Sequence, residues 1–119
     1  METALDQQVH QELMDARTDP AQSCGVARTL QVLDGKWTTL IVRELLAGPL
    51  RFTQLRSALG DISAKTLTDR LRALEHQGIL TRTIHAEVPP RVVYELTEQG
   101  RSLQVVLHAM LRWGRAHPA

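Results

Sequence analysis

The sequence is poor in aromatic residues, in cysteine and in long hydrophobic runs, and each shortage excludes a class of protein. Aromatic side chains make up 3% of the 119 residues, so a core has to be built from aliphatic residues, which favours helices. The single cysteine, Cys24, excludes a fold held together by intrachain disulfides. No apolar run approaches the roughly 20 residues of a membrane-spanning helix, and no secretory leader opens the chain. We therefore expect one cytoplasmic domain with no membrane partner.

Charge is distributed unevenly along the chain. Residues 1–23 contain five acidic residues against one arginine, a net charge of −4. The rest of the chain contains 13 basic and 8 acidic residues, a net charge of +5. A basic body behind an acidic arm suits a nucleic-acid partner, although polarised charge is also common on ordinary protein surfaces.

Hydrophobic residues at helical spacing predict most of the secondary structure. Leu5, Val9 and Leu13 recur every four residues and predict a helix within the acidic arm. Thr18-Asp19-Pro20 ends it, because proline disfavours helix at the preceding residue. A second short helix is expected over residues 26–33, entered near Ser23-Cys24-Gly25. Further helices are expected over residues 37–46, 52–59 and 63–77, with a closing helix capped by Thr97.

Between the last two helices the pattern changes to that of a β-hairpin. Residues 79–84 and 91–96 are β-prone, and Glu87-Val88-Pro89-Pro90 forms the connection. The predicted fold is mainly α with a small β-hairpin (α+β), a winged helix-turn-helix that dimerises through its terminal helices. Residues 1–23 are expected to form an N-terminal arm. Residues 24–119 are expected to form the winged helix-turn-helix domain with its dimerisation helix.

The helix pair over residues 52–77 is the first candidate site. Gly60-Asp61-Ile62 joins its two helices, and a short turn containing glycine is how proteins present a second helix to the DNA major groove. Ser63 is a natural N-cap for that second helix. Its exposed face and flanks carry groups that suit base edges and phosphates: Lys65, Thr66, Thr68, Asp69, Arg70, Arg72 and His76. The same residues also suit an ordinary solvated helix face.

The hairpin strengthens the DNA-binding interpretation. Arg91, beside Pro89-Pro90, is placed to hold a cation over a minor groove, and narrow minor grooves attract arginine. An arginine there also suits an edge strand that must avoid aggregation. The order of helix-turn-helix, hairpin and closing helix is more specific than any one part. No catalytic residue or cofactor is expected.

A stripe along the closing helix predicts a dimer. It consists of Leu103, Val106, Leu107, Met110 and Trp113. Such a stripe has no evident role in a monomer unless another surface covers it. The arm helix is one candidate cover, from the same chain or from a partner, and Trp37 and Trp113 are expected to be core or dimer anchors.

The sequence also resembles the HxlR family of bacterial transcriptional regulators, relatives of the MarR group. The resemblance runs from about residue 24 to the end and is carried by these stretches: Cys24-Gly25-Val26, Leu33-Asp34-Gly35-Lys36-Trp37, Ile41-Val42-Arg43-Glu44-Leu45, residues 51–56, residues 62–71 and residues 87–97. It implies a homodimer that binds a roughly palindromic double-stranded DNA operator through the helix starting at Ser63 and the wing around Arg91. It also implies repression as the commoner outcome.

Cys24 is a candidate redox sensor on the same resemblance. Some family members sense oxidants or electrophiles through a cysteine near the N-terminus, and a thiol at a helix start is more reactive. The alternative is a small buried residue without chemistry. The family often has proline after this cysteine, whereas Gly25 stands here.

The sequence argues against two rival functions. An enzyme is disfavoured, because His85-Ala86-Glu87 lacks the Pro-Cys-x-x-Cys partner of a zinc deaminase and no metal or phosphate-binding motif is present. A winged helix that docks protein would have an apolar centre on its exposed face, which the basic residues of the second helix argue against.

Overall fold

The computed structural model describes residues 3–119, apart from the side chains of residues 22 and 23. Glu2, counted above in the acidic arm, lies outside the described residues. The chain divides into two compact units, one up to Gln31 and the other from Val32 onward. Among the described residues, no helix combines the length and hydrophobicity that a membrane crossing needs.

The first unit is built from two helices, α1 (Ala4–Thr18) and α2 (Pro20–Val32), the latter ending one residue beyond it. Thr3 and Asp6 start α1 with a capping box. The Asp6 N–H donates to Thr3 Oγ1 at 3.0 Å, and Asp6 Oδ2 accepts from the Thr3 N–H at 3.1 Å. The arm helix predicted from Leu5, Val9 and Leu13 is therefore present, and all three side chains are exposed.

The start of α2 differs from the prediction. The helix does not begin near Cys24 but at Pro20, four residues earlier. Proline is favoured as the first helical residue because its missing N–H would be unpaired there anyway. The Ala21 N–H donates to Asp19 Oδ1 at 3.0 Å, which satisfies a free amide of the first turn. Cys24 consequently lies a full turn inside the helix, and the argument that a helix start activates its thiol is wrong.

The second unit contains the winged-helix elements in the predicted order. They are α3 (Gly35–Leu45), β1 (Leu50–Arg51), α4 (Phe52–Leu59), α5 (Ala64–His76), β2 (Leu80–His85), β3 (Arg91–Leu96), α6 (Glu98–Arg101) and α7 (Gln104–Ala116). The core is aliphatic, as the scarcity of aromatics predicted. It consists of Val32, Ile41, Val42, Leu45, Leu55, Ile62, Leu67, Leu71, Leu74, Ile79, Leu80 and Leu96. Trp37 packs against it, as expected of a core anchor.

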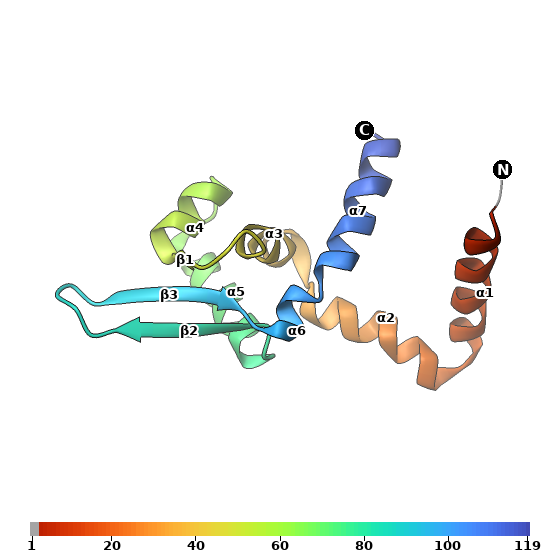
Figure 1. The fold of residues 1–119 in the computed structure, drawn as a ribbon, viewed down its shortest axis with the longest axis horizontal. Helices are drawn as coiled ribbons and strands as arrows, with labels where there is room; N and C mark the ends of the chain where they lie inside the picture. Colours follow the sequence, from red (N-terminus) through yellow and green to blue (C-terminus); the bar gives the residue numbers. More distant parts are fainter. Residues whose placement is uncertain (1–2) are drawn as a thin grey trace. The chain divides into compact units, whose positions relative to one another are not determined.

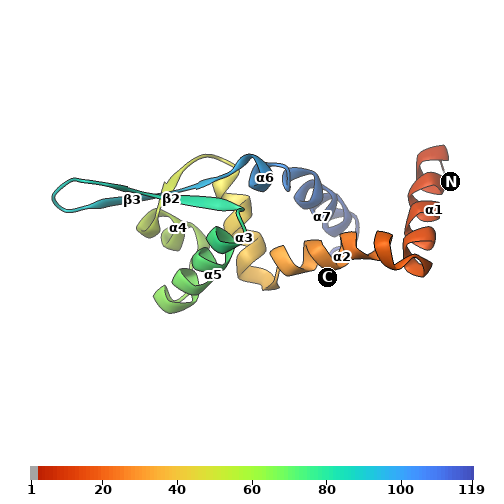
Figure 2. The same ribbon diagram turned by 90° about the horizontal axis from the view of Figure 1, so that it is seen from below.

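The strands of the described chain form one antiparallel sheet in the order β1-β3-β2. The hairpin pairs Leu80 with Leu96 at one end and His85 with Arg91 at the other, so its loop is residues 86–90. Helices α3, α4 and α5 gather against the near end of this sheet, and the far end of the hairpin projects beyond them (Figures 1 and 2). Strand β1, which pairs Arg51 with Val93, was not predicted. It is only two residues long, which is too short to show the alternating hydrophobic pattern of a strand.

The closing segment is two helices rather than one. Thr97 caps α6 as predicted, since its Oγ1 accepts from the Gly100 N–H at 3.1 Å. Leu103 and Leu107 pack partly against the core of their own unit, so the argument that the stripe lacks cover in a monomer is wrong for these two residues. Met110 and Trp113 are 51% and 66% exposed, so the same core does not cover them.

Candidate nucleic-acid interface

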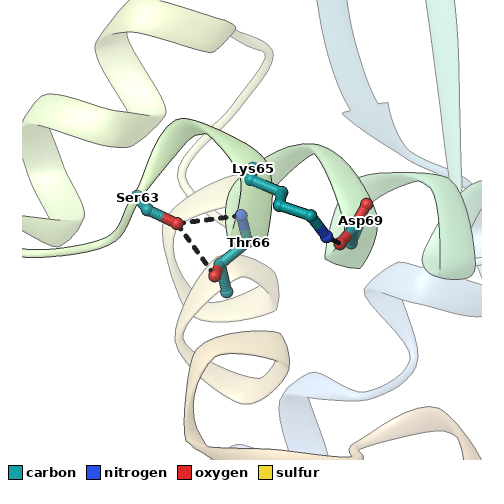
Figure 3. Close-up of polar contacts among 4 residues, drawn as sticks. All are labelled: Ser63, Lys65, Thr66 and Asp69. Atoms are coloured by element: carbon teal, nitrogen blue, oxygen red, sulfur yellow. Dashed lines mark hydrogen bonds and ion pairs between the residues drawn. The ribbon is translucent and has the colours of Figure 1, made fainter.

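The second helix of the helix-turn-helix, α5, starts at a well-defined cap. Ser63 Oγ accepts from the Thr66 N–H at 3.0 Å and donates to Thr66 Oγ1 at 2.9 Å (Figure 3). The preceding turn is held from α4, because Arg56 Nε donates to the Ile62 carbonyl oxygen at 3.2 Å. Gly60 has a φ of +86°, a conformation that glycine adopts without strain. Together these contacts fix where the exposed face of α5 begins.

Lys65 and Asp69 form an ion pair on that face. Lys65 Nζ lies 2.9 Å from Asp69 Oδ2, one helical turn along α5 (Figure 3). The side chains are 86% and 54% exposed, so both are available to a partner. The hydrogen bond from Lys65, followed by its charge, holds the pKa of Asp69 below the ordinary value. Asp69 is therefore an ionised, acceptor-only group at neutral pH.

Thr68 and Arg72 lie on the side of α5 that turns toward the sheet. Both line a small hollow of about 130 Å³ that Phe52, Tyr94 and Arg82 also line. Partial burial raises the pKa of Tyr94, and the charges of Arg82 and Arg72 oppose that effect. Arg72 is exposed, as its predicted place on the outward face requires, and it also borders the junction between α5 and the wing. Arg70 and Thr66 are half-buried, and His76 is exposed in the last turn.

The wing arginine is held within its own loop. Arg91 Nη2 lies 3.2 Å from Glu87 Oε1, and among the described residues Arg91 Nε is buried without a hydrogen-bond partner. The loop borders a hollow of about 370 Å³ whose other wall includes Arg51 and Thr53. Val88, at the tip, is fully exposed. The wing therefore presents a partly neutralised cation and an apolar tip.

Three arginines near this surface were not predicted as site residues. Arg51 reaches the wing hollow because β1 pairs with β3. Arg56 holds the turn, and Arg82 Nε lies 3.6 Å from Glu75 Oε1 beside Arg72. Arg51 and Arg56 both lie in residues 51–56, a stretch that carries the family resemblance. The position of Arg82 depends on tertiary contacts.

Cys24 is exposed on α2 and its Sγ donates to the Pro20 carbonyl oxygen at 3.2 Å. It belongs to the first unit, and the helix-turn-helix elements belong to the second. Within residues 3–119, no group of three or more His, Cys, Asp or Glu residues is arranged to hold a metal ion.

A helix-turn-helix with a capped, exposed second helix, followed by a β-hairpin wing, defines a winged-helix protein of the MarR type. The chain belongs to the HxlR-like helix-turn-helix family, whose model matches residues 32–118. Its relatives include the uncharacterized HTH-type transcriptional regulator sll1512 of Synechocystis sp., 44% identical over 88% of this chain and 81% of the relative. The uncharacterized HTH-type regulator YtcD of Bacillus subtilis is 41% identical over 77% of this chain and 73% of the relative. The protein is thus an HTH-type transcriptional regulator.

Solved structures of redox regulators share this fold. The redox regulator HypR in its oxidized form is 38% identical, with a TM-score of 0.75 over 81% of this chain and 99% of that one. The reduced transcriptional regulator YodB from B. subtilis is 33% identical, with a TM-score of 0.69 over 85% of this chain and 95% of that one. YodB has also been solved after diamide treatment and bound to quinone.

Proposed function

We propose that this regulator is a homodimeric repressor that binds a pseudo-palindromic operator, with α5 in the major groove and the wing beside it. The observation that carries the proposal is the exposed face of α5. It begins at the Ser63 cap, presents Lys65 and Asp69 to solvent, and continues without an apolar centre. A helix start with free amides and an exposed cation suits a phosphate backbone.

The wing and the junction supply the remaining proposed contacts. Arg91 and the neighbouring Arg51 are placed for phosphate or minor-groove contacts beside α5. Arg72 is exposed on α5 beside the sheet, where we propose that it contacts a phosphate or a base edge. Thr66, Thr68 and Arg70 complete the proposed set.

Homodimerisation is proposed through α7. Its exposed hydrophobic side chains are Val105, Met110, Leu111 and Trp113, with Val106 half-buried beside them. Two recognition helices on a symmetric dimer would then read half-sites about 34 Å apart, one turn of B-DNA.

Cys24 is the proposed site of a response to small oxidants or electrophiles. Two observations support it: the thiol is exposed, and fold relatives include a redox regulator and a quinone-bound regulator. The comparison that tests it is operator binding by wild type and Cys24→Ser, with and without diamide. If diamide modifies Cys24 but leaves wild-type binding unchanged, Cys24 is not a switch.

The DNA proposal is tested by salt-dependent binding to a fluorescent duplex. A dimer that makes about six to ten phosphate contacts should lose roughly 10³–10⁵ in affinity between about 50 and 200 mM salt. Lys65→Ala should weaken binding, because it removes an exposed cation from the face of α5 that is proposed to meet DNA. Arg17→Ala, which removes a cation from α1, is the matched control and should leave binding unchanged. Equal affinity across the salt range would overturn the proposal.

A further inference from the structure

The Lys65–Asp69 pair has no clear purpose in stability. Exposed ion pairs one helical turn apart contribute little to stability. The order here, with the cation nearer the N-terminus, is also the less favourable one. A carboxylate at the centre of a surface that approaches a polyanion costs binding energy on every DNA sequence. We therefore expect the Asp69 carboxylate, in the second turn of α5, to have a function in recognition.

The geometry of the pair matches the amino and carbonyl groups at the major-groove edge of a base pair. Lys65 Nζ and Asp69 Oδ2 lie 2.9 Å apart, a donor beside an acceptor. In the major groove a C·G pair presents the cytosine N4 donor beside the guanine O6 acceptor. Those two atoms are joined by a Watson–Crick hydrogen bond, so their separation is also about 2.9 Å. The protein pair has the same spacing and the opposite polarity. An A·T pair presents adenine N6 beside thymine O4 in the same way, so C·G is favoured by side-chain preference: Lys donates to guanine O6 and N7, and Asp accepts from cytosine N4.

We propose that Lys65 and Asp69 read a C·G base pair as a unit, in which Asp69 accepts from cytosine N4 and Lys65 donates to guanine O6 or N7. Asp69 is the specificity-determining member, because its charge also weakens binding to duplexes that offer it no amino group. This inference rests on the proposed function, since it requires α5 to lie in the major groove.

The chain offers a contrast at the wing. Arg91 is paired with Glu87 in the same way, at 3.2 Å, but it lies at the start of β3, on the wing that is proposed to approach a minor groove. The minor groove carries little base information beyond A·T against G·C. Glu87→Gln should therefore raise affinity for all duplexes alike, whereas a change at Asp69 should alter base preference.

The test is selection of binding sites from a pool of duplexes with about 20 randomised base pairs, two turns of B-DNA. Wild type should select C·G at one pair of symmetry-related positions. Asp69→Ala should lose about fivefold or more of that preference and bind an unselected duplex more tightly. Asp69→Asn should shift the same positions toward adenine, which an amide pairs with. Glu98→Gln, which removes an exposed carboxylate from α6, controls for net charge and should keep the wild-type preference.

Two results would overturn the inference, and they are distinguishable. If wild type selects a site and Asp69→Ala selects the same bases at every position, Asp69 reads no base and the proposed function survives. If wild type selects no site and binds no duplex, the proposed function fails and this inference with it. Circular dichroism of each variant establishes that the fold is unchanged.

Discussion

Ser63 sets the start of α5 through a single oxygen atom. Its Oγ satisfies the Thr66 N–H, one of the four amides that a helix start leaves without an intrahelical partner. Because the exposed face of α5 is defined relative to this first turn, the cap fixes which side chains face outward. Stability and recognition thus depend on the same residue.

Replacement of Ser63 by alanine should lower the free energy of unfolding by about 1 kcal/mol, within a range of roughly 0.5–2 kcal/mol. Urea unfolding followed by circular dichroism measures the change. Ser57→Ala makes the same chemical change within α4, where the side chain is exposed and does not cap a helix, and should leave stability nearly unchanged. Equal stability of the two variants would show that the cap contributes nothing.

The Asp69 carboxyl gives a test of the ion pair that needs no DNA. Its pKa is held below the ordinary 3.8 by the hydrogen bond and charge of Lys65. A carboxyl whose folded pKa is lowered stabilises the fold above its unfolded pKa and loses that contribution as pH falls through the folded pKa. Wild type should therefore lose more stability than Asp69→Asn as pH falls from about 5 to below 3.8.

The direct measurement is an NMR titration of the Asp69 carboxyl carbon. In Lys65→Met the pKa of Asp69 should rise toward 3.8, because the main causes of the shift have been removed. A titration curve identical to that of wild type would mean that the pair does not persist in solution.

At the scale of elements, the hairpin is joined to the closing helices by a close backbone contact. Gly100 in α6 lies against Ile79, whose carbonyl oxygen also accepts from the Thr97 N–H at 3.0 Å. A Cβ on Gly100 would collide with this carbonyl oxygen, which is backbone and cannot turn away as a flexible side chain would. The base of the wing and the start of α6 are therefore fixed to each other.

Gly100→Ala should destabilise the protein by about 1–3 kcal/mol, the usual cost of overpacking a tight site. The matched control is Gly114→Ala in α7, where a Cβ would meet nothing within 4 Å. That change should be neutral or stabilise by up to about 1 kcal/mol, because alanine favours helix over glycine. Thermal and urea unfolding of both variants check the contrast. A Gly100→Ala protein as stable as wild type would contradict the close contact.

Sequence patterns predicted the elements that combine a regular hydrophobic spacing with residues that mark their two ends. Helix α5 is the best case, since its apolar stripe lies between the Ser63 cap and Gly78, whose φ is +75°. Patterns failed where one residue has two uses: Pro20 lies in the break that ends α1, as predicted, but it also begins α2, which the hydrophobic spacing did not indicate. They failed again at β1, which exists only because β3 lies beside it.

The candidate site likewise contains residues that the sequence predicted and residues that it missed. Projection onto a helix was enough to place Lys65 and Asp69 outward, because exposure on a helix follows from spacing alone. It also placed Arg72 outward, and Arg72 is exposed, but projection alone does not show that Arg72 borders the hollow beside the sheet as well. Arg51 was missed because its position depends on a strand pairing that is distant in sequence.

At the scale of the molecule, α7 exposes several large hydrophobic side chains to solvent. Val105, Met110 and Leu111 are 72%, 51% and 47% exposed. A hollow of about 420 Å³ with largely aliphatic walls lies between α7 and α3. Contiguous apolar patches of this kind commonly mark contacts between proteins, and a symmetric dimer places the same patch on both partners.

Sedimentation equilibrium at micromolar concentration should therefore give a mass about twice the 13.3 kDa of one chain. Met110→Asp should shift the protein to monomer, because a charge on the proposed interface would be buried without a partner. Met110 is a better site for this test than Leu107. Leu107 packs partly against the core of its own chain, so an aspartate there would also destabilise the fold. Val88→Asp makes a similar change at the exposed wing tip and should leave the dimer intact. A monomeric wild type, or a Met110→Asp protein that remains dimeric, would exclude α7 as the interface.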